Sequence, residues 1–346
     1  MCIIAGYVGT KRAAPILIEM LRKEEAIDSG FYTGIATIHE GKIHYRKKVG
    51  SLERLLAETD AADLPGTIGI LHGRTPGGKG TDVDSWSHPF TCEKDGEVKT
   101  AFILNGFQGF FKDWNTENII PVAQSLIDAG YEMKTAVPAD GFTPCLANGT
   151  RVHGSDVRTQ YASKLILEGM DTVTATAKTF CDIPVEAVGL MLAQAEPDAI
   201  TWVRYNFPMH LSFADHGAYL ATVPLAFPED AGNTILLPAA SSGLIKKDHY
   251  TCHPFKEPHA SVAPITPELW KAAYEKIIEH IRKGETVFRP IVDPLFRGGD
   301  VTQMGAVLYQ VLSDLYKQGR LKIEIHYVPG HGEGIMAPKA RYILVE

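Results

Sequence analysis

Several features that mark common protein classes are missing from this chain of 346 residues. No stretch approaches the roughly 18 consecutive apolar residues that a membrane-spanning helix requires. The 5 cysteines are scattered without Cys-x-x-Cys spacing, which indicates neither a disulfide framework nor a zinc site. Lysine and arginine total 34 against 41 acidic residues, and the resulting net charge of −7 disfavours nucleic acid and anionic membranes as partners.

Signals for export and for phosphate binding are also absent. The apolar segment 2–8 is very short, and Lys11 and Arg12 follow it, whereas a secretory signal begins with basic residues and continues the apolar run. The glycine-rich segment 77–80 lacks the spacing of a phosphate-binding loop and the Ser or Thr that opens the following helix. We therefore expect a cytoplasmic protein that needs no metal and no cofactor.

The chain has ample apolar content for a large core, with 45% hydrophobic residues. A strand is predicted at 2–8 and an amphipathic helix at 13–23, and paired strands are predicted at 29–39 and 42–49. The other expected strands are 67–72, 99–104, 200–204, 209–213, 218–223 and 234–237, and the other helices are 52–59, 116–129 and 156–168. Because helices lie between sets of antiparallel strands, the pattern favours an α+β layered sandwich over a doubly wound sheet.

The second half of the chain contains two irregular segments. Residues 131–153 show no period and are predicted to form an inserted loop. Residues 254–267 contain four prolines and resemble a linker. We predict a main domain over 1–255 and a small C-terminal domain over 256–346. The C-terminal domain is expected to have two helices (267–283 and 302–318) and a hairpin (321–327 with 340–345), similar to a winged helix.

Cys2 is the residue with the most distinctive chemistry. Removal of Met1 would place a thiol and a free α-amine on the same residue. An α-amine titrates near 7.7–8.0, close to the pH at which a general base works best. It could therefore take the thiol proton without a histidine. A buried structural thiol is the alternative, and position 2 alone favours it.

The order of further motifs supports the catalytic interpretation. The opening Met1-Cys2-Ile3-Ile4-Ala5-Gly6-Tyr7 resembles the M-C-G-I-x-G start of class II glutamine amidotransferases, which are N-terminal-nucleophile (Ntn) hydrolases. The elements that follow in that family's order are Asp28-Ser29-Gly30-Phe31, His72-Gly73-Arg74-Thr75, Ser87-His88-Pro89-Phe90, Leu104-Asn105-Gly106 and Ser155-Asp156. This resemblance implies the αββα sandwich of Ntn hydrolases for the main domain.

The resemblance also implies a role for each matched residue. Cys2 would attack the side-chain amide of glutamine, and the Asn105 side chain with the Gly106 backbone N–H would stabilise the oxyanion. Arg74 would bind the α-carboxylate of glutamine and Asp156 its α-ammonium group. Considered alone, Asn105-Gly106 is equally compatible with a hairpin turn, Arg74 with a surface ion pair and Asp156 with a helix N-cap. His88 is predicted to be structural.

Two departures from the family keep other functions open. Ile3 replaces the glycine after the nucleophile, and Thr75 to Lys79 replace the residues that normally follow the arginine. The first hypothesis is a glutaminase that releases ammonia to a separate synthase subunit. The second is an Ntn hydrolase that acts on another small amide. The third is a catalytically silent scaffold or regulatory protein.

Overall fold

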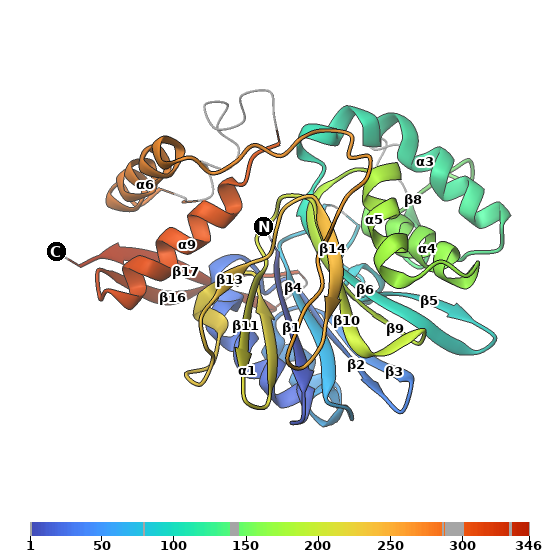
Figure 1. Cartoon of the computed structure of the whole chain (residues 1–346), viewed down its shortest axis with the longest axis horizontal. Coiled ribbons are helices and arrows are strands. Elements are labelled where there is room, and N and C mark those ends of the chain that lie inside the picture. The colour runs from blue at the N-terminus through green and yellow to red at the C-terminus, as the bar shows by residue number, and fades with distance from the viewer. Residues whose placement is uncertain are drawn as a thin grey trace.

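The computed structural model describes residues 2–78, 80–138, 145–285, 287, 301–331 and 334–345. Within these residues, two antiparallel sheets lie face to face, and helices cover the outer face of each sheet (Figure 1). This αββα sandwich is the α+β architecture that the sequence predicts. No helix in the described part of the chain is long and apolar enough to cross a membrane.

The first sheet has seven strands among the described residues, and the N-terminal strand lies in its middle. Its order is β13 (Ile235–Leu236), β11 (His210–Ala214), β12 (Gly217–Ala221), β1 (Ile3–Gly9), β4 (Ile68–Arg74), β2 (Tyr32–His39) and β3 (Lys42–Val49). β1 pairs with β12 on one side and with β4 on the other. The residues at its start are therefore held from both edges.

The second sheet has six strands in the described part of the chain. Its order is β15 (His253–Pro254), β14 (Ser241–Ile245), β10 (Glu196–Arg204), β9 (Glu186–Ala193), β6 (Glu97–Phe107) and β5 (Phe90–Lys94). The insertion that the sequence predicts as a loop contains a short ladder between β7 (Val137–Pro138) and β8 (Thr150–Arg151).

The alternation of side chains along β1 divides its residues between two cores. Ile4 packs between the sheets in the cluster that contains Leu190 and Trp202. Ile3 points to the opposite face and packs with Leu17 in the outer core. The side chain that replaces the family's glycine therefore anchors the strand to the helical layer on the other side of the sheet.

Helices cover both outer faces of the sandwich. α1 (Ala13–Asp28) and α2 (Leu52–Glu58) cover the first sheet, and α3 (Lys112–Asp128), α4 (Gly154–Leu167) and α5 (Thr172–Asp182) cover the second (Figure 1). α1 buries Leu17, Met20 and Leu21 on one face, the spacing expected of an amphipathic helix.

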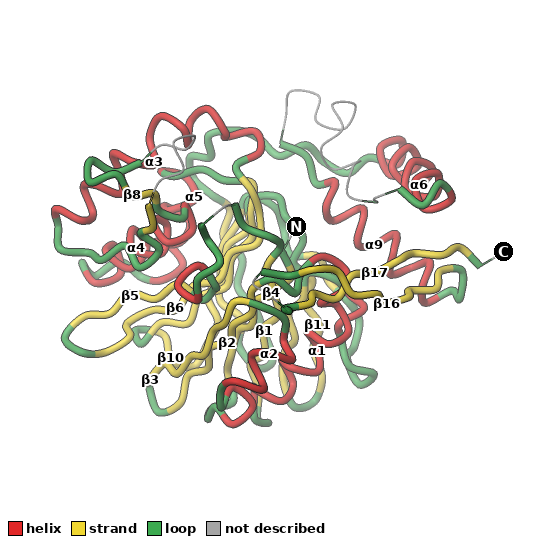
Figure 2. The backbone as a smooth tube through the Cα atoms, turned by 180° about the vertical axis from the view of Figure 1, so that it is seen from behind, coloured by secondary structure: helices red, strands yellow, loops and turns green. Residues whose placement is uncertain are grey.

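The C-terminal segment packs against the outer side of α1. It contains α6 (Pro267–Arg282), α9 (Met304–Lys317) and the hairpin of β16 (Leu321–Pro329) and β17 (Met336–Leu344), close to the predicted bounds. Figure 2 shows this hairpin beside α1. Ile277 and Leu308 belong to the same outer core as Leu17. The described residues on the two sides of the predicted domain boundary thus share one core, and the boundary itself stays a prediction.

Five elements of the second sheet and its helical layer are absent from the sequence prediction: β5, α5, β9, β14 and β15. α5 contains five β-branched residues in 11, a composition with low intrinsic helix propensity. The Asp171 carboxylate nevertheless accepts a hydrogen bond from the Thr174 backbone N–H at 2.9 Å and caps this helix. Every residue of β9 is buried, which removes the alternating pattern that identifies a half-exposed strand.

Candidate active site

Cys2 lies immediately before β1, at the end of the first sheet. The alternation along the strand places it on the same face as Ile4, toward the second sheet. Its side chain is only 8% exposed, and its Sγ lies 3.7 Å from Thr75 Oγ1. The thiol is therefore buried between the two sheets, near the end of the sandwich and next to the segment that follows β4.

β4 places two cationic or titratable side chains beside Cys2. Ile4 pairs with His72 and Ile3 with Gly73, so the antiparallel register brings Cys2 next to Arg74. His72 and Arg74 share a face, since they are two residues apart. Gly73 faces the other way, where an added Cβ would lie 2.5 Å from Ser29 Oγ. That close approach requires glycine at this position.

His72 is the residue that interacts most strongly with the thiol. Its Nε2 lies 3.0 Å from the carbonyl oxygen of Leu104, so the ring donates from Nε2 and leaves Nδ1 free to face Cys2. Nδ1 forms no hydrogen bond of ordinary length with a described residue. Burial raises the pKa of the Cys2 thiol, but the interactions with His72, with the N-terminal ammonium group and with Arg74 outweigh burial and bring that pKa from 9.0 down to about 6.

Two further buried histidines support the His72 ring. The ring of His88 stacks on His72 with centroids 4.0 Å apart, and His153 meets His88 edge-on at 5.7 Å. Burial and neighbouring positive charges hold the pKa of both His88 and His153 well below its usual value. Both rings are therefore neutral near pH 7, with His88 stacked on His72 and His153 packed against His88.

Arg74 is buried in an aromatic pocket, and some of its guanidinium N–H donors are available to a ligand. Its guanidinium lies over the rings of Tyr32 and Trp86, at 4.6 and 5.5 Å from their centroids, and Nη1 donates to the Trp86 carbonyl at 3.1 Å. No described carboxylate contributes to its electrostatic environment. The surface ion pair that the sequence also allowed is therefore not formed. A buried, largely unpaired guanidinium is suited to a carboxylate ligand.

The tip of the C-terminal hairpin reaches this pocket. His331 packs against the rings of Phe31 and Tyr32, at centroid distances of 5.5 and 4.9 Å. Its Nε2 accepts a hydrogen bond from the Gly77 backbone N–H at 3.1 Å. The segment after Arg74, which differs from the family pattern, is thus held by a residue more than 250 positions away in the sequence.

Asn105 extends from β6 into the space between the sheets. It is fully buried, and its Nδ2 donates to Thr222 Oγ1 at 3.4 Å. The same hydroxyl accepts from the Ile4 backbone N–H at 2.9 Å. Thr222 therefore links the predicted oxyanion donor on one sheet to the strand that carries the nucleophile on the other.

Asn105 and Gly106 lie within β6, where they pair with Val188 and Ala187 of β9. The hairpin turn considered from sequence is therefore wrong. The explanation of Gly106 by a turn conformation is wrong too, because its φ is not positive. A Cβ on Gly106 would lie 2.1 Å from the Glu186 carbonyl oxygen, so close packing of two strands requires the glycine.

Asp156 lies in the first turn of α4, and His153 is the N-cap of that helix. The simple N-cap interpretation of Asp156 is therefore wrong. Its carboxylate is fully buried and accepts hydrogen bonds from Thr135 N at 2.9 Å, Thr135 Oγ1 at 2.8 Å and Gln160 Nε2 at 3.1 Å. Burial raises the pKa of Asp156 despite these bonds. The carboxylate thus ties the insertion to α4, and its contact with substrate stays a prediction.

A cavity of about 600 Å³ opens beside Gly106. Gly106, Lys112, His153 and Ser155 line it, whereas Cys2 and Arg74 do not. The described residues contain no group of three or more His, Cys, Asp or Glu side chains that could hold a metal ion. The structure therefore brings Cys2, His72, Arg74 and Asn105 to one end of the two sheets, whereas Asp156 does not line the cavity.

Sequence reasoning missed the parts played by His72 and Thr222. His72 was recognised only as a motif position, although its spacing of two from Arg74 places both side chains on one face of a strand. Thr222 carries no motif, and only the packing of the two sheets reveals its contacts.

Comparison with known proteins places these features in a wider group. No family model matches the chain. The glutamine–fructose-6-phosphate aminotransferase of Pyrococcus horikoshii is 25% identical over 253 residues, which cover 72% of this chain and 37% of that protein. The enzyme of the same name from Caldanaerobacter subterraneus is 28% identical over 250 residues, which cover 72% and 36%. The chain spans little more than a third of the length of these curated relatives.

Solved structures show the same fold at low sequence identity. Glutamine phosphoribosylpyrophosphate amidotransferase from B. subtilis superposes with a TM-score of 0.58 and 12% identity, covering 83% of this chain and 59% of that one. An allosteric regulatory enzyme of purine biosynthesis superposes with the same TM-score and 13% identity, covering 80% and 52%. The two stacked sheets, the helical layers and the position of Cys2 define an Ntn-hydrolase fold. Within that class, the chain is similar to class II glutamine amidotransferase domains.

Proposed function

We propose that the domain hydrolyses the side-chain amide of glutamine through a γ-glutamyl thioester on Cys2 and releases glutamate and ammonia. The observation that carries this proposal is the environment of the Cys2 thiol. With a pKa of about 6, the thiol is mostly ionised at neutral pH although it is buried. A buried thiolate that neighbours an unpaired guanidinium is a costly arrangement for a purely structural residue.

The chemical steps follow from the groups around Cys2. The thiolate attacks the amide carbon of glutamine, and negative charge develops on the amide oxygen. Asn105 Nδ2 and the Gly106 N–H are suited to stabilise that oxyanion, provided that Nδ2 exchanges its long hydrogen bond to Thr222. The C–N bond breaks when the departing nitrogen takes a proton and leaves as ammonia. Water then attacks the thioester, restores the thiolate and releases glutamate.

Two groups are candidates for proton transfer. After removal of Met1, the α-amine of Cys2 would lie on the same residue as the thiol and could give the leaving nitrogen its proton. His72 is already placed beside the thiol, where it favours the thiolate form. The structure therefore supports a division of roles in which His72 stabilises the nucleophile and the α-amine handles the leaving group.

Substrate recognition rests on Arg74 in this proposal. Its aromatic pocket leaves guanidinium donors for the α-carboxylate of glutamine. Asp156 would bind the α-ammonium group only if a rearrangement releases it from Thr135 or Gln160. The ammonia acceptor is proposed to be a separate synthase partner.

Hydrolysis of another small amide is the second candidate. The segment after Arg74 differs from the family pattern, and its Gly77 is held by His331 of the C-terminal hairpin. Ile3 gives this candidate no support, since its side chain packs on the far side of the sheet. A catalytically silent scaffold is the third candidate, and the depressed pKa of Cys2 weighs against it.

The discriminating experiment measures kcat/KM for glutamine and for a simple primary amide with wild type, Cys2→Ser and Arg74→Ala. Cys2→Ser should lower turnover of both by several orders of magnitude. Arg74→Ala should weaken glutamine about 10- to 150-fold, because a hydrogen bond to a charged group contributes roughly 1.5–3 kcal/mol. Equal effects of Arg74→Ala on both substrates would favour the other-amide hydrolase. Unchanged turnover in Cys2→Ser would exclude both enzymatic proposals.

A further inference from the structure

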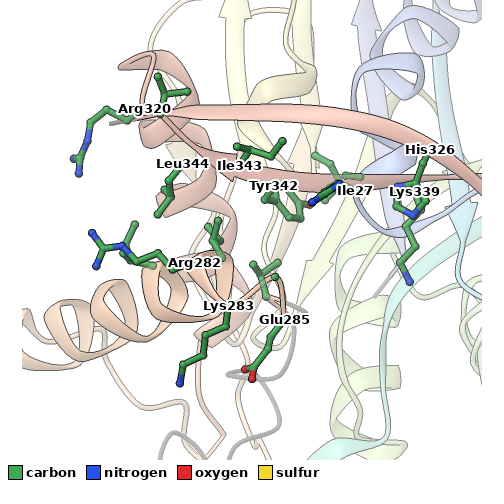
Figure 3. Close-up of a pocket in the computed structure, with 17 residues that line it drawn as sticks. Ile27, Arg282, Lys283, Glu285, Arg320, His326, Lys339, Tyr342, Ile343 and Leu344 are labelled. Carbon is green, nitrogen blue, oxygen red and sulfur yellow. The ribbon is translucent and has the colours of Figure 1, made fainter.

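A large groove lies in the C-terminal part of the molecule, apart from the candidate active site. It has a volume of about 1260 Å³ and is bounded by the end of α6, the turn after α9 and strand β17 (Figure 3). None of Cys2, Arg74 or Asn105 lines it. The mechanism proposed above makes no use of this groove.

The charge of the groove is opposite to that of the whole chain. Its charged side chains are those of Arg282, Lys283, Glu285, Arg320, Lys339 and Arg341, so five of the six are cationic. The chain as a whole has a net charge of −7. The Glu285 carboxylate is paired with His280, whose Nδ1 lies 2.6 Å away. Among the described lining residues, one carboxylate therefore faces five cations.

Most of these cations lack a carboxylate partner within the described residues. Lys283 is paired with Glu279 at 2.5 Å, but no ion pair of Arg282, Arg320 or Lys339 is found there. Arg320 instead donates from Nη1 to Tyr274 Oη at 3.1 Å. Cations at helix C-termini are common, and this explains the position of Arg282 at the end of α6. It does not explain Lys339, which comes from a strand.

The floor of the groove is apolar. Ile278 and Ile281 of α6 and Ile27 of α1 belong to the outer core, and Tyr342 and Leu344 of β17 pack against it. Figure 3 shows Tyr342 in the middle of the groove, Leu344 beside Arg282 and Arg320 toward one end, and Lys339 toward the other. The hydroxyl of Tyr342 is buried, so the ring rather than the hydroxyl is offered to the groove.

We propose that this groove binds a phosphorylated small molecule, with its phosphates at the end formed by Arg282 and Arg320 and a flat or apolar body over Tyr342 and Leu344. Phosphate is matched by guanidinium groups, which offer several donors in one plane. The uncharged part of the ligand would be stabilised by contact with the apolar side chains that line the groove. The volume is sufficient for a ligand of nucleotide size. The site is independent of glutamine hydrolysis.

Three probes separate the contribution of the phosphates to binding from that of the uncharged part of the ligand. Isothermal titration calorimetry of the full chain would be carried out with inorganic pyrophosphate, ADP and adenosine at low and moderate salt. ADP should bind most tightly, pyrophosphate more weakly and adenosine weakest. The affinity for ADP and pyrophosphate should fall as salt rises, since screening weakens exposed charge pairs. Failure of both anionic probes to bind at millimolar concentration would overturn the proposal.

Matched variants test the position of the site. Arg282→Gln/Arg320→Gln should weaken ADP at least tenfold, and Tyr342→Leu should weaken ADP but not pyrophosphate. The control Lys94→Gln/Lys247→Gln removes the same charge at exposed positions outside the groove and should leave affinity unchanged. An equal loss in the control pair would show diffuse attraction and overturn the proposal. Binding of anionic phospholipid vesicles without binding of ADP would do the same, because it would assign the cations to a membrane surface.

Discussion

Replacement of His72 by glutamine should raise the pKa of the Cys2 thiol from about 6 toward its ordinary value of 9.0. His72 interacts with Cys2 from a ring whose Nε2 is held by the Leu104 carbonyl at 3.0 Å. Glutamine can retain a hydrogen bond but carries no positive charge. The burial of Cys2, at 8% exposure, remains in the variant and continues to disfavour the thiolate.

The magnitude follows from the balance of these effects. In the wild type, attraction to His72, and to a smaller extent to the N-terminal ammonium group and Arg74, overcomes burial and lowers the thiol pKa from 9.0 to about 6. At pH 7 roughly nine-tenths of Cys2 is then thiolate, whereas a pKa of 9 or above leaves about one-hundredth. The alkylation rate at pH 7 should fall by less than this ratio, because a more basic thiolate is also more nucleophilic. The midpoint of the pH profile is therefore the quantity to measure.

The assay is iodoacetamide alkylation across pH 4 to 10, followed by mass spectrometry of the peptide that contains Cys2. Cys145 is exposed and serves as an internal reference whose profile should be the same in all variants. His88→Gln is the matched control, because His88 is buried and neutral and should leave the Cys2 midpoint within one unit of 6. A midpoint near 6 in His72→Gln, or near 9 in the wild type, would refute the assignment of His72.

Three further predictions concern the oxyanion site, chain processing and stability. Asn105→Ala should lower kcat by about 10²–10³ with little change in KM, and steady-state kinetics that show a loss confined to KM would assign Asn105 to ground-state binding. A preparation that retains Met1, verified by intact mass, should keep an alkylation midpoint near 6 but lose glutamine turnover by about 10²–10⁴, whereas full turnover would make the α-amine unnecessary. Burial raises the pKa of Glu25 from 4.5 to about 7, so the stability linked to its protonation is full below pH 4.5 and is lost as pH rises through 7. Urea unfolding of Glu25→Gln and wild type at pH 5 and pH 8 should therefore differ in pH dependence by roughly 3 kcal/mol, and identical pH dependence would contradict the buried position of Glu25.

The sequence predicts the first sheet well because its strands have clear patterns. The N-terminal strand, the pair that follows it and the strand ending at Arg74 all occur within a few residues of their predicted bounds. The second sheet is predicted less well. β9 is buried throughout, and α5 is rich in threonine, so neither shows the period of its structure.

The candidate site is predicted as a set of residues but not as an arrangement. The motifs select Cys2, Arg74, Asn105 and Gly106, and the structure places them at one end of the stacked sheets. The link through Thr222 depends on contact between residues more than 100 positions apart, which no local pattern encodes. Likewise, the role of Gly106 follows from the approach of β9, a strand that the sequence pattern does not reveal.

The most direct test of the account is the mass of the purified chain after reaction with a diazo-ketone analogue of glutamine. Such a reagent binds as glutamine does and alkylates the nucleophile that attacks it. We predict one adduct per chain, located on Cys2 by peptide mapping, formed at the rate at which glutaminase activity disappears, and slowed by excess glutamine. No adduct on a chain that lacks Met1, or an adduct on Cys145 with Cys2 unmodified, would contradict the claim that Cys2 is the nucleophile of a glutamine site.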